Sequence, residues 1–261
     1  RGSVLDVSET PSSPRSNHAL PLAIIGLVVG GICVLISQAF DWLPEAASLE
    51  SNSVDALIWW CIWVSIGVFT VVITFLLYSI WKFRAPDGED LDGAPLHGHT
   101  GLEIIWTIIP TVIIGVTAVW SAIVVVDNEK VSAAPGGPMY VDVVGRQFVW
   151  DFTYPELGIT TGDLRVPTDR QVILRLQAKD VIHSFFVYET RIKGDAVPGI
   201  VNDRVRFTMK TGTAGKSYPI VCAELCGAGH SVMRARMYVL SPGDFDAWTA
   251  TAKREAVAAK G

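Results

Sequence analysis

Three long apolar segments constrain this chain most strongly, because each is long enough to cross a lipid bilayer. They lie at residues 19–40, 56–81 and 102–126. A helix of about twenty apolar residues spans the hydrocarbon core of a membrane. Half of all residues are hydrophobic and only 18% are charged, and the apolar excess falls before Asp127. The sequence therefore predicts a transmembrane region at 19–126, followed by a domain of ordinary soluble composition at 127–261.

The first apolar segment has an alternative interpretation. Residues 37–39 read Ser-Gln-Ala, a small-residue pattern typical of the cleavage site of a secretory signal peptide. We expect a retained helix over 19–40 and keep the signal peptide as the alternative. Residues 1–18 are rich in Ser and Pro and lack hydrophobic periodicity, which predicts a flexible N-terminal tail.

Basic residues predict the orientation of the helices. Lys82 and Arg84 directly follow the second apolar segment. Because Lys and Arg favour the cytoplasmic side, the loop at 82–100 is expected there. The third helix then runs outward, so residues 127–261 and the acidic stretch 41–55 are predicted to be extracytoplasmic.

The pattern changes after Asp127 to short alternating segments separated by Gly, Pro and Asp, which is typical of strands and turns. So many strands in a short domain predict an antiparallel β-sandwich. Candidate copper ligands on one late loop, Cys222–Met233, and on one earlier strand, at His183, make a cupredoxin-like Greek key the specific prediction. Ser241 followed by Pro242 predicts the start of a short C-terminal helix that ends near Ala259. The fold class is thus an α+β membrane protein. The expected strands are 139–144, 146–154, 171–178, 183–187, 204–209, 217–221 and 235–240.

Two thiols, an imidazole and a thioether lie within twelve residues near the end of the chain. Cys222, Cys226, His230 and Met233 follow the spacing C-x3-C-x3-H-x2-M. Sulfur ligands are soft and suit Cu(I), and imidazole serves both oxidation states of copper. His183 is the only other histidine in the last third of the sequence. Because two sulfurs are available to bridge, we predict a pair of copper ions, each with one histidine and a weak axial group.

Two simpler interpretations of this motif explain less of it. A local disulfide between Cys222 and Cys226 gives no role to His230 or Met233. A zinc site would favour four strong ligands and has little use for a thioether. Copper is therefore favoured. A metal enclosed by protein ligands leaves no position for a substrate, so the site is expected to carry electrons.

At this point the chain resembles the cytochrome c oxidase subunit II family, whose CuA copper loop has this ligand pattern. The resemblance covers about residues 57–248. The further blocks that carry it are Leu102–Pro110, Gly145–Trp150, Asp180–Ser184 and Lys193–Gly199.

The resemblance implies a function and a set of partners. A dinuclear CuA centre accepts electrons from a cytochrome c or a similar donor. It passes them to haem in subunit I, which reduces oxygen to water and pumps protons. Subunit I and subunit III are the implied protein partners, and the plasma membrane of a prokaryote is the implied location. The sequence contains no nucleic-acid-binding motif.

The resemblance also implies roles for two acidic residues. The residue matching Glu224 gives its backbone oxygen to copper and its carboxylate to a Mg²⁺ ion shared with subunit I. The alternative is a solvated loop carboxylate. The residue matching Glu103 lies at the entrance of a proton path. The alternative is an acid in the first turn of a helix, where it favours the helix dipole.

The electron donor is the point at which the sequence departs from the family. Many relatives have tryptophan, the residue of electron entry from soluble cytochrome c, where this chain has Phe148. Trp150 is the next candidate, expected on the same strand face. Residues 127–261 carry 17 Lys and Arg against 15 Asp and Glu, so a basic donor gains little long-range attraction. We therefore expect a donor that is tethered or held in a supercomplex, with an acidic cytochrome or a small copper protein as alternatives.

Other functions use part of the same pattern. A membrane-tethered copper carrier needs exposed, exchangeable ligands. The second subunit of a quinol oxidase lacks the copper ligands that are present here. A copper-containing nitric oxide reductase keeps the site in a different enzyme and stays open as the alternative.

Overall fold

The computed structural model describes residues 17–84, 88, 98–133 and 136–258. The expected tail at 1–18, apart from its last two residues, and most of the expected loop at 82–100 lie outside the described residues. The chain divides into two compact units, one of residues 1–40 and 62–97 and the other of residues 41–61 and 98–261.

The first unit contains α1 (Ala19–Ala39) and most of α2 (Ser51–Lys82). Small residues bring the two helices together. A Cβ atom on Gly30 would lie 3.3 Å from Thr70 Cγ2, and one on Gly26 would lie 3.4 Å from Thr74 Oγ1. Close approach through small side chains is how helices pack inside membranes, where no hydrophobic effect drives them together.

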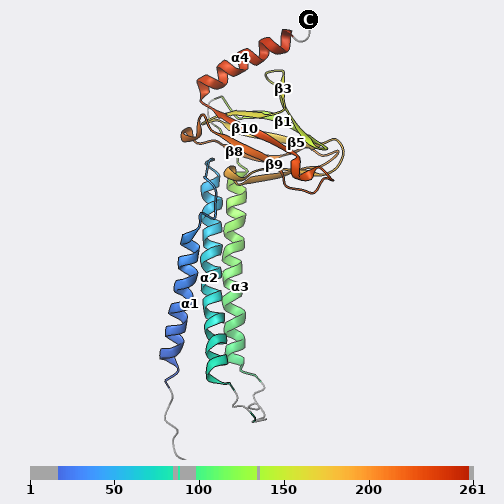
Figure 1. The fold of residues 1–261 in the computed structure, drawn as a ribbon. Coiled ribbons are helices and arrows are strands. Elements are labelled where there is room, and N and C mark those ends of the chain that lie inside the picture. Colours follow the sequence, from blue (N-terminus) through green and yellow to red (C-terminus); the bar gives the residue numbers. More distant parts are fainter. Residues whose placement is uncertain (1–16, 85–87, 89–97, 134–135, 259–261) are drawn as a thin grey trace, which may run out of the picture. The chain divides into compact units, whose positions relative to one another are not determined.

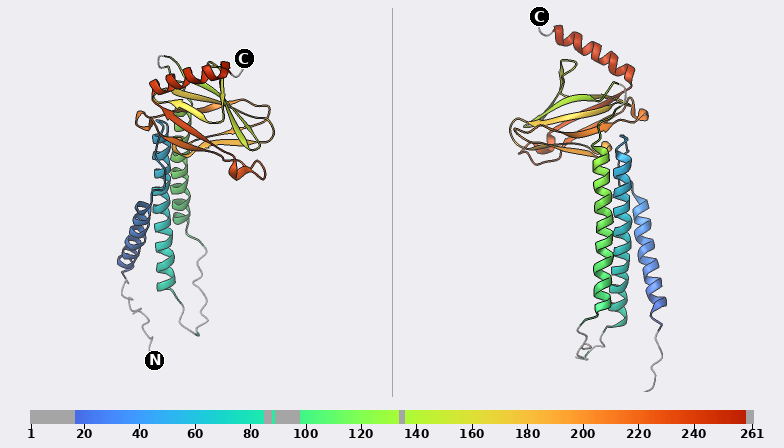
Figure 2. Two further views of the ribbon diagram at one scale, coloured as in Figure 1. Left: turned by 45° about the horizontal axis from the view of Figure 1, so that its top comes forward. Right: turned by 180° about the vertical axis from the view of Figure 1, so that it is seen from behind.

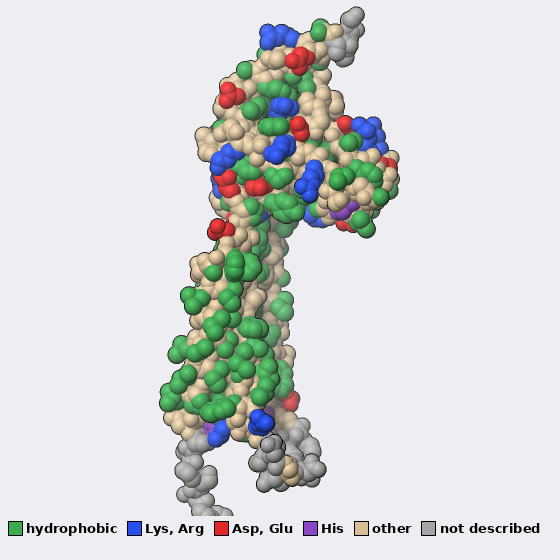
Figure 3. Space-filling view, viewed as in Figure 1, with side chains coloured by type: hydrophobic (Ala, Val, Ile, Leu, Met, Phe, Trp, Pro, Cys, Tyr) green, Lys and Arg blue, Asp and Glu red, His purple; other side chains and the backbone are tan. Residues whose placement is uncertain are grey.

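The second unit contains the first turns of α2 and all of α3 (Thr100–Asn128). Trp60 Nε1 donates a hydrogen bond of 3.0 Å to Thr117 Oγ1, which joins the two helices. Among the described residues, three helices (α1, α2 and α3) are long and apolar enough to cross a membrane. In the view of Figure 3, hydrophobic side chains are numerous on the helices, whereas charged side chains are frequent on the β-domain, the strands and final helix of residues 139–258.

Ten strands form two sheets in the part of the chain that the structure describes (Figure 1). One sheet has the order β3 (Ile159–Thr161), β2 (Val149–Tyr154), β1 (Met139–Arg146), β5 (Gln171–Ala178) and β8 (Asn202–Thr208). The other has the order β4 (Leu164–Pro167), β10 (Arg234–Leu240), β9 (Ser217–Cys222), β6 (His183–Val187) and β7 (Ile192–Ala196). The predicted sandwich is confirmed.

Two strand pairs depart from the predicted antiparallel arrangement. β1 pairs with β5 in parallel, and β10 pairs with β4 in parallel. The chain leaves one sheet for the other between these strands and returns in the same direction. Alternating hydrophobicity along each strand shows which face is buried, but it cannot show the direction of a neighbour that lies far away in the sequence.

Between the sheets lies a core of aliphatic and aromatic side chains. Phe152 from one sheet packs edge-on against Phe185 from the other, with ring centroids 6.4 Å apart. Tyr154 is 1% exposed, yet its hydroxyl is satisfied by the backbone of Arg165, donating to the carbonyl at 2.9 Å and accepting from the N–H at 2.7 Å. The core therefore joins the sheets without leaving this buried polar group unpaired.

The acidic stretch 41–55, expected to be a loop, is built into the β-domain. The Leu49 N–H donates to the Thr208 carbonyl, and the Lys210 N–H donates to the Ala47 carbonyl. Arg191 donates two hydrogen bonds to the Asp55 carboxylate, from Nε to Oδ1 at 2.6 Å and from Nη2 to Oδ2 at 3.1 Å. Only 5% of the Arg191 side chain is exposed. This bidentate pair fixes the first turns of α2 to the β-domain.

A final helix, α4 (Pro242–Ala258), lies outside the two sheets (Figure 2). The Ser241 hydroxyl accepts from the Asp244 N–H at 3.2 Å, which confirms the predicted cap. Trp248 holds the helix in place by packing against Tyr154, with ring centroids 5.3 Å apart.

Candidate metal centre

Two neighbouring strands and one loop supply the predicted metal ligands. His183 is the first residue of β6 and Cys222 is the last residue of β9. β6 and β9 are paired, with Cys222 opposite Phe185. Cys226 and His230 lie on the loop between β9 and β10, and Met233 immediately precedes β10. The pairing therefore places a histidine from one strand beside a thiol from the next.

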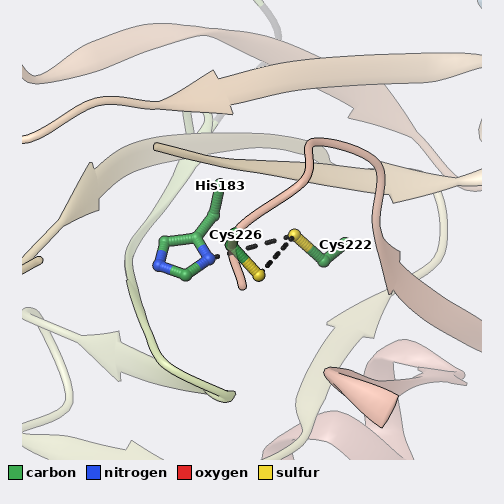
Figure 4. A group of neighbouring side chains, drawn as sticks. All are labelled: His183, Cys222 and Cys226. Carbon is green, nitrogen blue, oxygen red and sulfur yellow. Dashed lines mark hydrogen bonds between the residues drawn. The ribbon is translucent and has the colours of Figure 1, made fainter. Parts of the chain in front are cut away.

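The donor atoms of the candidate ligands lie close together. Among the described residues, His183, Cys222 and Cys226 form a group whose ligand atoms all lie within 4.8 Å of one another (Figure 4). Cys222 Sγ is 3.9 Å from His183 Nδ1 and 3.9 Å from Cys226 Sγ. Cys226 Sγ is in turn 3.7 Å from His230 Nδ1 and 3.8 Å from Met233 Sδ. Each thiol therefore lies within 4 Å of the Nδ1 atom of a different histidine.

These separations fit metal ligation and not a disulfide. Two ligands of one tetrahedral first-row metal ion, with bonds of about 2.0–2.3 Å, lie about 3.3–3.8 Å apart. A disulfide would bring the sulfurs to about 2.05 Å, and both cysteines are free. The set of two thiols, two imidazoles and a thioether is soft, as copper prefers. The residues present therefore fit a copper centre.

Burial of the donors also favours a cation at this position. His183 and Met233 are 0% exposed, Cys226 is 3% exposed and Cys222 is 7% exposed. Burial and the neighbouring Cys222 thiol raise the pKa of Cys226 to about 11. The Cys226 thiol therefore resists ionisation, and a bound metal ion would offset this cost when it displaces the proton.

Asp180 orients the histidine on β6. His183 Nε2 lies 2.8 Å from Asp180 Oδ1. Burial alone would raise the pKa of Asp180, but hydrogen bonds from the Gln147 N–H, His183 and the Val181 N–H outweigh it and lower the pKa to about 2. A charged carboxylate can only accept, so Nε2 donates and Nδ1 is left to face the sulfurs. Such a carboxylate behind a ligand histidine is a common feature of metal sites.

Sequence reasoning gave no role to two residues that contact the ligands, Asp180 and Gln147. Asp180 precedes His183 by three residues, and this spacing could have indicated a hydrogen bond between the carboxylate and the histidine ring. Gln147 Nε2 donates a hydrogen bond of 2.6 Å to the carbonyl oxygen of Cys226, 79 positions away. No pattern in the sequence indicates that contact.

Glu224 lies between the cysteines, and its two functional groups face different surroundings. Its carbonyl oxygen is 3.2 Å from Cys222 Sγ, close to the predicted centre. Glu224 as a whole is exposed to solvent. The backbone oxygen is thus near the predicted copper ligands, while the residue itself is exposed.

The two aromatic residues proposed for electron entry occupy different positions. The expected strand at 146–154 is wrong at its start, because Arg146 ends β1, Gln147 and Phe148 form a turn, and β2 begins at Val149. Phe148 is half-buried beside the copper loop. Trp150 is 2% exposed and packs edge-on against His183, with ring centroids 5.9 Å apart. Because Trp150 is buried, an electron donor bound to the surface of this chain would not contact it directly.

Glu103 closes the first turn of α3. Its Oε1 accepts a hydrogen bond of 3.3 Å from the His99 N–H, and the His99 ring accepts one of 3.2 Å from the Leu102 N–H. This reciprocal arrangement caps the helix. A proton-path role for Glu103 stays a prediction.

The comparisons with known proteins agree with this geometry. Residues 22–124 match the family described as cytochrome c oxidase subunit II, transmembrane domain, and residues 159–239 match its periplasmic domain. Cytochrome c oxidase subunit 2 of Synechocystis sp. is 33% identical over 88% of this chain and 83% of that protein. The protein of the same name from Thermostichus vulcanus is 32% identical over 88% of this chain and 85% of that protein.

A similar solved structure is the periplasmic domain of subunit II of the cytochrome oxidase of Bradyrhizobium japonicum. It is 24% identical, with a TM-score of 0.42, over 46% of this chain and 97% of that chain.

The position of Met233 leads to a test of its role. Met233→Leu keeps the buried volume and removes the sulfur, a change that usually costs less than about 1.5 kcal/mol. Because a thioether is a weak axial ligand, we expect the variant to keep its copper but to show a shifted spectrum and reduction potential. Met237→Leu is the matched control, since Met237 is also 0% exposed and lies within β10.

Two results would contradict this ranking of ligands. If Met233→Leu loses copper as fully as a cysteine variant, the thioether is a primary ligand. If its spectrum matches that of Met237→Leu, Met233 does not ligate.

Proposed function

The chain belongs to the cytochrome c oxidase subunit II family, and we propose that it transfers electrons through a dinuclear copper centre of the CuA type. It is the electron-transfer subunit of an aerobic oxidase and thus part of an oxidoreductase complex. The convergence of His183, Cys222 and Cys226, buried and within 4.8 Å, is the observation that carries the proposal. His230 and Met233 complete the ligand set.

The protein is a membrane protein with its β-domain outside the cytoplasm. The relatives from Synechocystis sp. and Thermostichus vulcanus are prokaryotic, and three of the described helices are suited to cross a membrane. Electrons therefore enter on the outer side of the membrane.

The ligands suit electron transfer because they are fixed in place and enclosed. Cys222 and Cys226 would hold a copper pair between their thiolates, and such a pair would share one unpaired electron, so that gaining or losing it would change the bonds little. His183 and Cys222 lie on paired strands, and Asp180 holds the His183 ring. The ligands therefore keep their positions in both oxidation states. Filled ligand positions also leave no place for a substrate.

Burial of the ligands argues against a copper carrier. A carrier exchanges its metal through accessible donors, whereas His183 and Met233 are 0% exposed. No observation favours a nitric oxide reductase over an oxygen-reducing enzyme.

Copper content is the direct test of the centre. The purified complex is expected to hold two copper atoms in this subunit and to show the delocalised spin of a mixed-valence pair. Cys222→Ser and Cys226→Ser each remove a bridging thiolate and should abolish that signal. Cys61→Ser, at a free and exposed cysteine on α2, is the matched control. A single copper with a blue-copper spectrum, or no copper in this subunit, would overturn the dinuclear assignment.

The protein partners are proposed from the family to which the chain belongs. We propose that electrons pass from this centre to haem in subunit I, with subunit III as a further partner. Glu224 is proposed to give its carbonyl oxygen to copper and its exposed carboxylate to a Mg²⁺ ion shared with subunit I. Hard carboxylate oxygens suit Mg²⁺, and the 3.2 Å separation between its carbonyl oxygen and Cys222 Sγ supports the first role.

Manganese in place of magnesium tests the second role of Glu224. Mn²⁺ bound in the complex gives a resolved magnetic-resonance signal. Glu224→Gln removes the charge, and we expect the Mn²⁺ signal to be lost while the copper signal remains, because the backbone carbonyl is unchanged. Glu156→Gln, an exposed acid in the turn after β2, is the control. An unchanged Mn²⁺ signal in Glu224→Gln would exclude the carboxylate as a ligand.

The donor is proposed to be tethered or held in a supercomplex. Residues 127–261 carry a net formal charge of about +2, from 17 basic and 15 acidic side chains. Near Phe148, Arg146 is neutralised by Asp151, with Nε 2.9 Å from Oδ2. Neither feature attracts a basic cytochrome over long range. Proximity would then replace electrostatic steering, and the half-buried Phe148 is the proposed point of entry.

Ionic strength tests the nature of the donor. The rate of oxidation of a soluble basic cytochrome c is expected to be low and to change little with added salt. The same cytochrome with its lysines acetylated should react at a similar rate, because charge contributes little to the encounter. Fast turnover at low salt that falls steeply with added salt would contradict the proposal.

A further inference from the structure

Gln147 forms hydrogen bonds to two different parts of the metal centre. Its side-chain Nε2 donates to the carbonyl oxygen of Cys226 at 2.6 Å. Its backbone N–H donates to Asp180 Oδ2 at 2.7 Å. Both distances are at or below the short end of the normal range, so both bonds are strong. One residue in the turn between β1 and β2 therefore reaches a ligand loop on one side and a carboxylate on the other.

Asp180 extends this contact to the histidine ligand. Its Oδ1 accepts from His183 Nε2 at 2.8 Å, while Oδ2 is occupied by Gln147. A continuous series of hydrogen bonds thus runs from the Cys226 peptide through Gln147 and Asp180 to the His183 ring. Cys226 lies on the β9–β10 loop and His183 lies on β6. The series links two ligands that the strands alone do not hold at a fixed separation.

The copper loop lies tightly against the same turn. A Cβ atom on Gly229 would lie 2.4 Å from Phe148 Cδ2, and one on Gly227 would lie 2.9 Å from Gln147 Nε2. Gly227 also has a φ of +127°, a conformation that favours glycine. The loop between the ligands can approach Gln147 and Phe148 only because it has no side chains at these positions.

We propose that Gln147 is a positioning residue that sets the geometry of the copper centre by joining Cys226 to His183 through Asp180. The inference rests on the proposed function of the site. The bond to the Cys226 carbonyl fixes the peptide that follows a bridging thiolate, and the bond to Asp180 fixes the carboxylate that orients a histidine. The donor N–H also places its positive end toward the ligand peptide, which favours the reduced centre.

Replacement of the side chain separates this role from packing. Gln147→Met keeps the length and the backbone bond to Asp180 but removes the donor to Cys226. Outer contacts of this kind change metal affinity by about 10–100-fold. In the purified complex we expect weaker copper retention against a chelator, a lower reduction potential and an altered mixed-valence signal. Gln177→Met, at an exposed glutamine on β5, should match the wild type in all three.

A second variant at the same position should give a larger shift in reduction potential. Gln147→Glu keeps the size and places a carboxylate against the Cys226 carbonyl, so its shift in potential should exceed that of Gln147→Met. If both variants match the wild type in copper retention, potential and signal, the positioning role is wrong.

The outcomes also separate this inference from the proposed function. A wild-type complex without a mixed-valence copper signal would refute the dinuclear centre itself. A wild-type signal that neither Gln147 variant alters would refute only the role of Gln147.

Discussion

Pairing between β6 and β9 is the interaction on which the metal centre depends. It brings His183 beside Cys222, residues 39 positions apart in the sequence, and fixes their donor atoms 3.9 Å from each other. The remaining ligands then need only a loop of the right length after Cys222. A change in register by one residue would turn the His183 side chain to the opposite face of the sheet and remove it from the site.

Hydrogen bonds around the ligands further fix the ligand positions that the paired strands establish. Asp180 selects the ring nitrogen of His183 that faces the sulfurs, and Gln147 holds the Cys226 peptide. Neither residue has a donor atom suited to copper in this arrangement, so their value lies in geometry. A rigid ligand set keeps rearrangement small when an electron arrives or leaves, which is what a carrier of electrons requires.

The link between the first turns of α2 and the β-domain uses a different kind of contact. Arg191 and Asp55 form a bidentate pair with little exposure, and the segment before α2 adds backbone bonds to Thr208 and Lys210. Removal of one partner would leave an unpaired charge with little solvent, a change that is strongly destabilising. The acidic stretch 41–55 therefore acts as a structural part of the β-domain.

The sequence by itself determined the features that depend on residues close together in the chain. Apolar runs of sufficient length predicted the three membrane helices, and Ser241 predicted the cap of α4. Four of the five side chains predicted to ligate copper fall within twelve residues, so their chemistry was evident from spacing and softness alone.

Only the tertiary structure decided the features that depend on distant residues. The parallel pairs of the sandwich, the turn that holds Phe148 and the burial of Trp150 all differ from expectation. The roles of Asp180 and Gln147 were not expected, because the bonds that Gln147 makes span 33 and 79 residues. Local patterns record which side chains are apolar, polar or soft. They do not record which distant backbone a folded sheet will place within hydrogen-bonding distance.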